Sequence, residues 1–167
     1  HKLGLVHRDL KPANVMLLKE SAEGDVVKVL DFGLVKPFLP DAPGQELEIT
    51  QAGVLLGSPL YMAPEQSKNE SDPRSDIYSL GVLLYQMLSG RPPFTGKQAI
   101  DVIVKHIREK PRPLHQLQAD VPPEVSHVVM KCLEKHPDKR YQSMDELLEA
   151  LKNTGLALGI AATATVT

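Results

Sequence analysis

The stretch HRDLKPAN, residues 7–14, decides the fold of this chain. It contains a carboxylate at Asp9, a cation two residues later at Lys11 and an amide five residues after the carboxylate at Asn14. A loop-capping aspartate alone would need neither of the other two groups at these offsets. The combination predicts a loop in which a carboxylate orients a hydroxyl while the cation and the amide meet phosphate and metal.

Two further motifs follow in order along the chain. Asp31-Phe32-Gly33 ends a short apolar run, and Ala63-Pro64-Glu65 comes later. A solvated loop with a chance HRD would explain one of these motifs but not all three. Together they predict the transfer of a phosphoryl group from a magnesium nucleotide to a hydroxyl.

The three motifs resemble those of the eukaryotic-like protein kinases, of the serine/threonine type found in many bacteria. The resemblance runs over residues 1–152, and residues 153–167 are expected to form a linker or juxtamembrane tail. It implies an α+β, mainly α fold: the large C-terminal lobe of a protein kinase, with a small β-hairpin carrying the active site. In that family a Gly-rich loop and a strand lysine precede HRD. Only six residues precede it here, so we expect the N-terminal lobe to be absent.

Composition narrows the functional classes. A chain of 167 residues predicts one domain, and the net charge of −2 gives no electrostatic support for nucleic-acid binding. The single cysteine, Cys132, excludes an internal disulfide, and its apolar helical surroundings predict a core residue. No run reaches the ~20 apolar residues of a membrane span. We expect a cytoplasmic domain, although the full-length protein could be anchored to a membrane.

Hydrophobic patterning predicts a hairpin and a buried helix. Residues 15–18 and 26–30 are short apolar runs separated by a polar stretch, which is typical of two antiparallel strands. Residues 76–89 are apolar on almost every side, so we expect a buried helix that begins at Asp76 and ends at Gly90.

Three amphipathic helices are predicted after it. Each is assigned an inward face from the spacing of its apolar residues. A capping box at residues 143–146 marks the start of the last one. The predicted inward residues are Ile100, Ile103, Val104 and Ile107 in the first helix, Val125, Val128, Val129 and Cys132 in the second, and Leu147, Leu148 and Leu151 in the third.

Asp9 is predicted to be the catalytic base. Its carboxylate can accept the proton of the substrate hydroxyl and aim the oxygen at the γ-phosphorus. Lys11 can meet the γ-phosphate as charge shifts during transfer. The resemblance implies serine/threonine specificity, because a lysine in DLKPxN marks that type of kinase.

Asn14 and Asp31 are predicted to hold the metal that accompanies ATP. Mg²⁺ (or Mn²⁺) is a hard cation that prefers such oxygen ligands. The resemblance implies that Met16 touches the adenine ring, supported by Leu83 and Met87 of the buried helix. The latter two also fit an ordinary core.

Other motif residues are assigned structural roles from the resemblance. His7 packs under Phe32 and braces the loop, and Gly33 lets the backbone swing. Asp76 accepts hydrogen bonds from the backbone of residues 7–14, named the catalytic loop below after its predicted role, although an ordinary helix N-cap would also explain Asp76. Glu65 pairs with Arg140 inside the fold.

Regulation is predicted in the segment between the second and third motifs. Arg8 and Lys36 occupy positions that grip a phosphate in the resembled family, and Thr50 is the candidate phosphosite, modified by another copy of the kinase. An unmodified loop threonine is the alternative. Ser58 is expected to bond Asp9 and Lys11 and so to report a docked substrate.

Three functional classes remain open. The intact motifs favour a kinase that phosphorylates serine or threonine in proteins. A pseudokinase scaffold that binds without transfer is the alternative, and a small-molecule kinase fits the docking motifs poorly. Gln86 stands where arginine-directed members carry an acidic residue, which predicts weak selection for arginine. Without the small lobe, the chain alone is expected to show no useful turnover.

Overall fold

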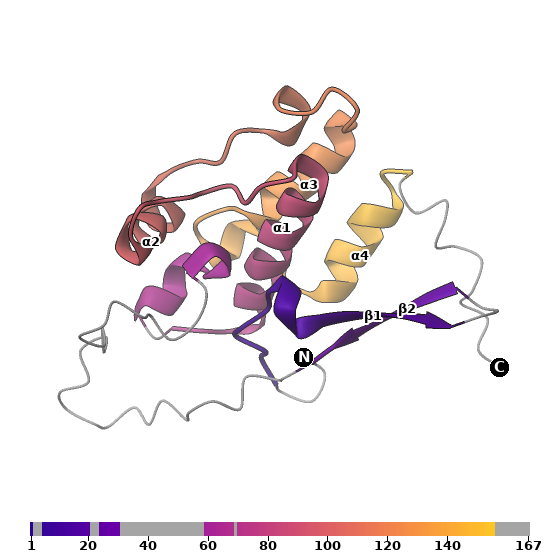
Figure 1. Cartoon of the computed structure of the whole chain (residues 1–167), viewed down its shortest axis with the longest axis horizontal. Coiled ribbons are helices and arrows are strands. Elements are labelled where there is room, and N and C mark those ends of the chain that lie inside the picture. Colours follow the sequence, from indigo (N-terminus) through magenta and orange to yellow (C-terminus); the bar gives the residue numbers. More distant parts are fainter. Residues whose placement is uncertain (2–4, 21–23, 31–58, 69, 156–167) are drawn as a thin grey trace.

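The computed structural model describes residues 1, 5–20, 24–30, 59–68 and 70–155. Within these ranges the regular structure is mainly helical, and the sheet has two antiparallel strands. The coarse expectation of a mostly helical fold with a small hairpin is confirmed. The elements are β1 (Val15–Glu20), β2 (Gly24–Val29), α1 (Pro73–Ser89), α2 (Ala99–Arg108), α3 (Pro123–Cys132) and α4 (Met144–Lys152) (Figure 1).

The hairpin forms where the two apolar runs predict it. Val15 pairs with Val29 and Leu18 with Val26. The pairing continues past the strand end, because the backbone N–H of Leu30 donates to the carbonyl of Asn14 at 2.8 Å. The catalytic loop therefore runs directly into β1, and β2 leads back to the same end of the hairpin.

Helix α1 occupies the centre of the molecule and begins earlier than predicted (Figure 1). Asp72 is its N-cap: the Asp72 side chain accepts the Arg74 N–H at 2.7 Å, and Pro73 fills the first helical position. Asp76 therefore lies inside the first turn, and the interpretation of Asp76 as an N-cap is wrong. The helix ends at Gly90, whose φ of 78° is the left-handed conformation that glycine adopts easily.

The first three turns of α1 form the core, but its last turn does not. Ile77, Tyr78 and Val82 are fully buried, whereas Met87 is 77% exposed. Elements that pack on α1, chiefly α3 and the 3₁₀ turn η2 (Pro59–Tyr61), cover the earlier turns. The prediction that Met87 belongs to the core is therefore wrong, while Leu83 is buried as expected.

Helices α1 and α3 approach each other at a glycine. A Cβ added to Gly81 would lie 2.6 Å from the Cβ of Cys132. Cys132 is buried, and the predicted inward residues of α3 are all buried with it. The small residue on α1 is thus what lets the two helices pack at this distance.

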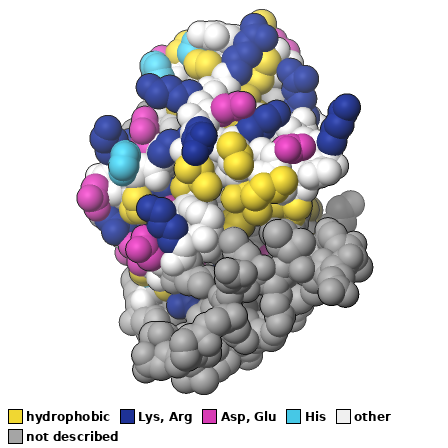
Figure 2. All heavy atoms as spheres, turned by 90° about the vertical axis from the view of Figure 1, so that its left-hand side faces the viewer, with side chains coloured by type: hydrophobic (Ala, Val, Ile, Leu, Met, Phe, Trp, Pro, Cys, Tyr) yellow, Lys and Arg dark blue, Asp and Glu magenta, His cyan; other side chains and the backbone are white. Residues whose placement is uncertain are grey.

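The buried face of α2 differs from the predicted one. Val102, Ile103 and His106 point inward, while Ile100, Val104 and Ile107 are exposed. Of the four residues predicted to face inward, only Ile103 does so, because a histidine with two internal hydrogen bonds takes a place on the inner face. Figure 2 views the molecule from the side on which α2 lies, and hydrophobic side chains reach the surface there.

Ser143 is the N-cap of helix α4, and its side chain accepts the Glu146 N–H at 3.1 Å. Leu147 is buried against the cluster that contains Ile77 and Cys132. Leu148, predicted to face inward, is exposed. None of the helices in the described ranges is long and apolar enough to cross a bilayer.

Candidate active site

Asp9, Lys11 and Asn14 form one hydrogen-bonded cluster in the catalytic loop. Lys11 Nζ lies 2.6 Å from Asp9 Oδ2. Asn14 Nδ2 donates to the main-chain carbonyl of Asp9 at 2.8 Å and to Asp9 Oδ2 at 3.2 Å. The Asp9 side chain remains 40% exposed, whereas Asn14 is buried. The arrangement holds an accessible carboxylate beside a cation, on a loop fixed by a buried amide.

Asp76, in the first turn of α1, binds the backbone of this loop. Its two carboxylate oxygens accept the backbone N–H groups of His7 at 2.7 Å and of Arg8 at 2.8 Å. Burial raises the pKa of Asp76, and the hydrogen bonds from the His7 and Arg8 N–H groups oppose that shift. The side chain of His1 also lies 2.8 Å from Asp76 Oδ2. The carboxylate thus provides acceptors for two neighbouring main-chain N–H groups of the loop.

His7 is built into the loop through both nitrogens of its ring. His7 Nε2 lies 2.9 Å from the carbonyl of Leu30, at the end of the hairpin, and His7 Nδ1 accepts the Asp9 N–H at 3.3 Å. His7 is buried. The ring therefore joins the catalytic loop to the strand that leads to Asp31.

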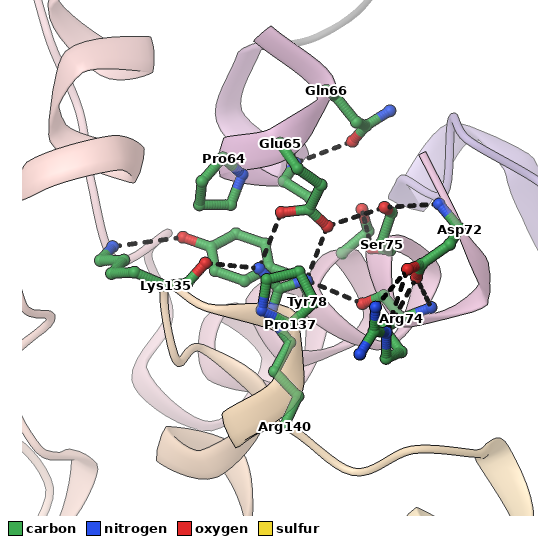
Figure 3. A network of polar contacts seen from close by, with 12 residues as sticks. Pro64, Glu65, Gln66, Asp72, Arg74, Ser75, Tyr78, Lys135, Pro137 and Arg140 are labelled. Carbon is green, nitrogen blue, oxygen red and sulfur yellow. Dashed lines mark hydrogen bonds and ion pairs between the residues drawn. The ribbon is translucent and has the colours of Figure 1, made fainter. Parts of the chain in front are cut away.

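Glu65 and Arg140 form a bidentate ion pair in the interior (Figure 3). Glu65 lies in the 3₁₀ turn η3 (Pro64–Lys68), and Arg140 follows α3. Burial would raise the pKa of Glu65, but the hydrogen bonds and positive charge of Arg140, with the Ser75 hydroxyl, outweigh it and lower the pKa. Arg140 uses its remaining donors on three backbone carbonyls: those of Arg74, Glu134 and Lys135.

A second polar network lies beside this pair. Tyr78 Oη is 2.8 Å from His106 Nδ1, and His106 Nε2 is 3.1 Å from the carbonyl of Leu60. Lys135 Nζ reaches Tyr78 Oη at 3.4 Å (Figure 3). His106 therefore ties α2 to η2. The predictions from sequence missed this role, because the apolar periodicity of α2 gives no weight to a histidine.

Gln66 is a second residue that the sequence did not single out. Its amide nitrogen donates to the carbonyl of Arg8 at 2.8 Å, and its amide oxygen accepts the Ala63 N–H at 2.8 Å. The contact joins residues 58 positions apart. No local pattern signals it; only the position of Gln66 directly after the Ala-Pro-Glu motif could have drawn attention.

Gln86 is engaged with Tyr61 at the end of η2. Tyr61 Oη donates to Gln86 Oε1 at 2.5 Å. Burial raises the pKa of Tyr61, with the Gln86 bond opposing. The position predicted to give only weak selection for arginine thus presents a neutral amide whose oxygen accepts a hydrogen bond from the protein itself.

Six of the predicted site residues lie outside the described residues: Asp31, Phe32, Gly33, Lys36, Thr50 and Ser58. The predicted meeting of Asp9 with Asp31, the packing of His7 under Phe32 and the bond from Ser58 therefore stay predictions. Met16, the predicted adenine contact on β1, is partly exposed. Leu5, Leu17 and Val27, in and near the hairpin, are also exposed.

Comparison with known proteins identifies the class to which this fold and loop belong. The protein kinase domain matches residues 1–151, so the chain belongs to the protein kinase family. It is 45% identical over 148 residues to the serine/threonine-protein kinase PknB of Mycolicibacterium smegmatis. It is 44% identical over 149 residues to a probable serine/threonine-protein kinase of Streptomyces coelicolor.

These matches cover most of the chain but little of the relatives. The matches to the Mycolicibacterium and Streptomyces kinases each include 88% of this chain. The chain spans 22% of the first relative and 21% of the second. A probable serine/threonine-protein kinase of Clostridium acetobutylicum is 37% identical over 154 residues, which is 92% of this chain and 22% of that protein. The chain therefore corresponds to about a fifth of the length of these serine/threonine kinases.

Proposed function

We propose that this chain supplies the catalytic loop of a kinase that transfers the γ-phosphoryl group of Mg-ATP to serine or threonine hydroxyls of proteins. The observation that carries the proposal is the cluster of Asp9, Lys11 and Asn14, with 2.6 Å between Lys11 Nζ and Asp9 Oδ2. The family membership and the serine/threonine kinases among the relatives support the same reaction.

Asp9 acts as the base in this proposal. Its exposed carboxylate accepts the proton of the substrate hydroxyl, so the oxygen is oriented for in-line attack on the γ-phosphorus. The transition state of phosphoryl transfer is loose, and orientation contributes more than basicity. Lys11 lies beside the attacking oxygen and stabilises charge on the transferring group. Asn14 keeps the Asp9 main chain in place through its 2.8 Å bond.

Asn14 and Asp31 would hold the magnesium ion. Asn14 donates to Asp9 through its nitrogen, and its amide oxygen is the atom suited to a hard cation. The residue before Asp31, Leu30, donates its N–H to the carbonyl of Asn14 at 2.8 Å, and this contact supports the proposed pairing. The bound ion supplies positive charge to the phosphates.

The regulatory proposal rests on Arg8, Lys36 and Thr50. The Arg8 side chain, within the catalytic loop, is exposed, which suits it to bind a phosphate at Thr50. A second copy of the kinase would add that phosphate, through transient self-association. Ser58 would bond Asp9 and Lys11 when a protein substrate is docked. Detection of unmodified Thr50 by mass spectrometry in the active full-length protein would argue against this regulation.

The test of the main proposal is a pair of isosteric variants in the full-length protein. Asp9→Asn removes the base and should lower kcat for phosphorylation of a serine-containing peptide by about 10²-fold or more, with ATP binding within threefold of wild type. Asp120→Asn, at an exposed loop position, is the matched control and should keep wild-type kcat. ATP binding without Asp9-dependent transfer would instead support the scaffold alternative.

A further inference from the structure

Arg8 has an unusual backbone conformation next to the proposed base. Its φ is 66°, and it is the sole residue other than glycine with a positive φ in the part of the chain that the structure describes. A residue with a side chain reaches this left-handed region at an energetic cost, because its Cβ lies too close to the following carbonyl oxygen. The peptide group that follows belongs to Arg8 and Asp9, so the conformation of Arg8 determines where the Asp9 side chain points.

Three side chains hold this backbone from different elements. Asp76 of α1 accepts the Arg8 N–H at 2.8 Å. On the next peptide group, His7 Nδ1 accepts the Asp9 N–H at 3.3 Å, and Gln66 Nε2 donates to the Arg8 carbonyl at 2.8 Å. The peptide between Arg8 and Asp9 is thus held at its N–H by His7 and at its oxygen by Gln66. Loss of the Gln66 bond would free one end of it.

Gln66 is itself well anchored. Its amide oxygen accepts the Ala63 N–H at 2.8 Å, which fixes the orientation of the amide and directs its N–H toward Arg8. The neighbouring Glu65 is bound to the buried Arg140 at 2.7 and 2.8 Å. Figure 3 shows the Glu65 and Gln66 side chains leaving η3 on different sides. One short turn is therefore anchored in the core at Glu65 and reaches the catalytic loop at Gln66.

We propose that Gln66 is a positioning residue that holds the Arg8–Asp9 peptide, and through it the Asp9 carboxylate, in the orientation needed for phosphoryl transfer. This inference rests on the proposed function, because it assigns Gln66 a task only if Asp9 is the base. Gln66 touches neither substrate nor metal in this proposal. It acts on the rate of transfer through the geometry of its neighbour, where displacements on the order of 1 Å change rates by about 10²-fold.

The experiment is Gln66→Glu in the full-length protein. Glutamate keeps an oxygen that can accept the Ala63 N–H, but it replaces the donor to the Arg8 carbonyl by a second, negatively charged oxygen. We expect kcat for peptide phosphorylation to fall about tenfold, with KM for ATP within twofold of wild type. Gln118→Glu, at an exposed position, controls for the added charge, and Ser67→Ala, which loses the bond from Ser67 to the Pro64 carbonyl, controls for loosening of η3. Both should keep kcat within twofold.

A second measurement separates this inference from the proposed function. Hydrogen exchange of the peptide covering residues 5–14 does not depend on activity and should be at least threefold faster in Gln66→Glu than in wild type. Faster exchange with normal kcat would refute a role in positioning, and unchanged exchange would show that Gln66 does not hold the loop. If the wild-type full-length protein transfers no phosphate, the proposed function fails, while the exchange result still reports on the contact. A uniform fall in thermal stability with kcat and KM both unchanged would also contradict the inference.

Discussion

Glu65 and Arg140, 75 residues apart in sequence, are joined by two parallel hydrogen bonds of 2.7 and 2.8 Å, and the Arg140 side chain has no exposed surface. Arg140 also donates to three backbone carbonyls. The pair therefore fixes η3, the first turn of α1 and the segment after α3 to one another. Because Arg140 is wholly buried, removing its partner leaves a charge that water cannot reach.

We predict that Glu65→Gln lowers the free energy of unfolding by roughly 3–5 kcal/mol, because the Arg140 charge stays buried without its counter-charge. Urea unfolding followed by circular dichroism measures the change. Glu149→Gln is the control: it disrupts the exposed pair of Glu149 with Lys152, at 2.8 Å, and should cost under about 1 kcal/mol. Equal effects of the two substitutions would show that the buried pair contributes nothing special.

The same pair predicts an acid dependence of stability. The pKa of Glu65 is lowered in the folded protein, so its contribution is fully present above the pKa of an unfolded glutamate and is lost as the pH falls through the folded pKa. The loss of stability on acidification below about pH 4.3 should therefore be smaller in Glu65→Gln than in wild type. Parallel stability curves for both proteins below that pH would contradict this expectation.

That Asp9, Lys11 and Asn14 share one loop could be predicted from the sequence, and the reason is local; their catalytic roles stay predictions. Asp9, Lys11 and Asn14 lie within six residues, so a single loop conformation decides whether they meet. The hydrogen bonds from the loop backbone to Asp76 are also predicted, but only through the family resemblance. The start of α1 is not predicted correctly, because the cap at Asp72 followed by Pro73 begins the helix before the apolar pattern does.

The face of α2 shows why other parts could not be predicted. Two overlapping sets of residues on α2 could face the core. Periodicity alone favours the set with Ile100, Ile103 and Ile107, because it contains more apolar residues. The fold selects the set with His106 instead, since both ring nitrogens bond groups that are 28 and 46 residues away. Contacts at such separations, like that between Gln66 and Arg8, leave no periodic signal in the sequence.

His106 should make stability depend on pH below neutrality. Burial lowers the pKa of His106 to about 4, with the nearby Lys135 contributing in the same direction. The folded protein then binds fewer protons than the unfolded chain between pH 6.5 and pH 4, so stability falls as the pH falls through that window. Tyr78 and Lys135 are the titratable groups facing the ring, and neither supplies a carboxylate.

We expect wild-type protein to lose about 2 kcal/mol more unfolding free energy than His106→Gln when the pH is lowered from 7 to 5. Urea unfolding at the two pH values gives the difference directly. His127→Gln, at an exposed position of α3, should retain the wild-type pH dependence. If His106→Gln also retains the wild-type pH dependence, His106 is protonated in the folded state at little cost, and the contacts with Tyr78 and Leu60 do not oppose its charge.

Gly81 offers a test of the packing between α1 and α3. A methyl group there would lie 2.6 Å from the Cβ of Cys132 and 3.3 Å from a methyl of Leu133, so one helix has to move. Although alanine favours a helix over glycine by about 1 kcal/mol, the overpacking cost of roughly 1–3 kcal/mol should exceed that gain. We predict that Gly81→Ala lowers the free energy of unfolding by up to about 2 kcal/mol.

The double variant Gly81→Ala/Cys132→Ala separates packing from propensity. Replacing the cysteine side chain removes the sulfur but leaves the Cβ, so the clash at 2.6 Å persists and stability should not return. Cys132→Gly removes that Cβ, and in its background Gly81→Ala should cost less than in wild type, by at least about 0.5 kcal/mol in a double-mutant cycle. Additive costs in this cycle would mean that the helices adjust freely, and that Gly81 is not what sets the distance between α1 and α3.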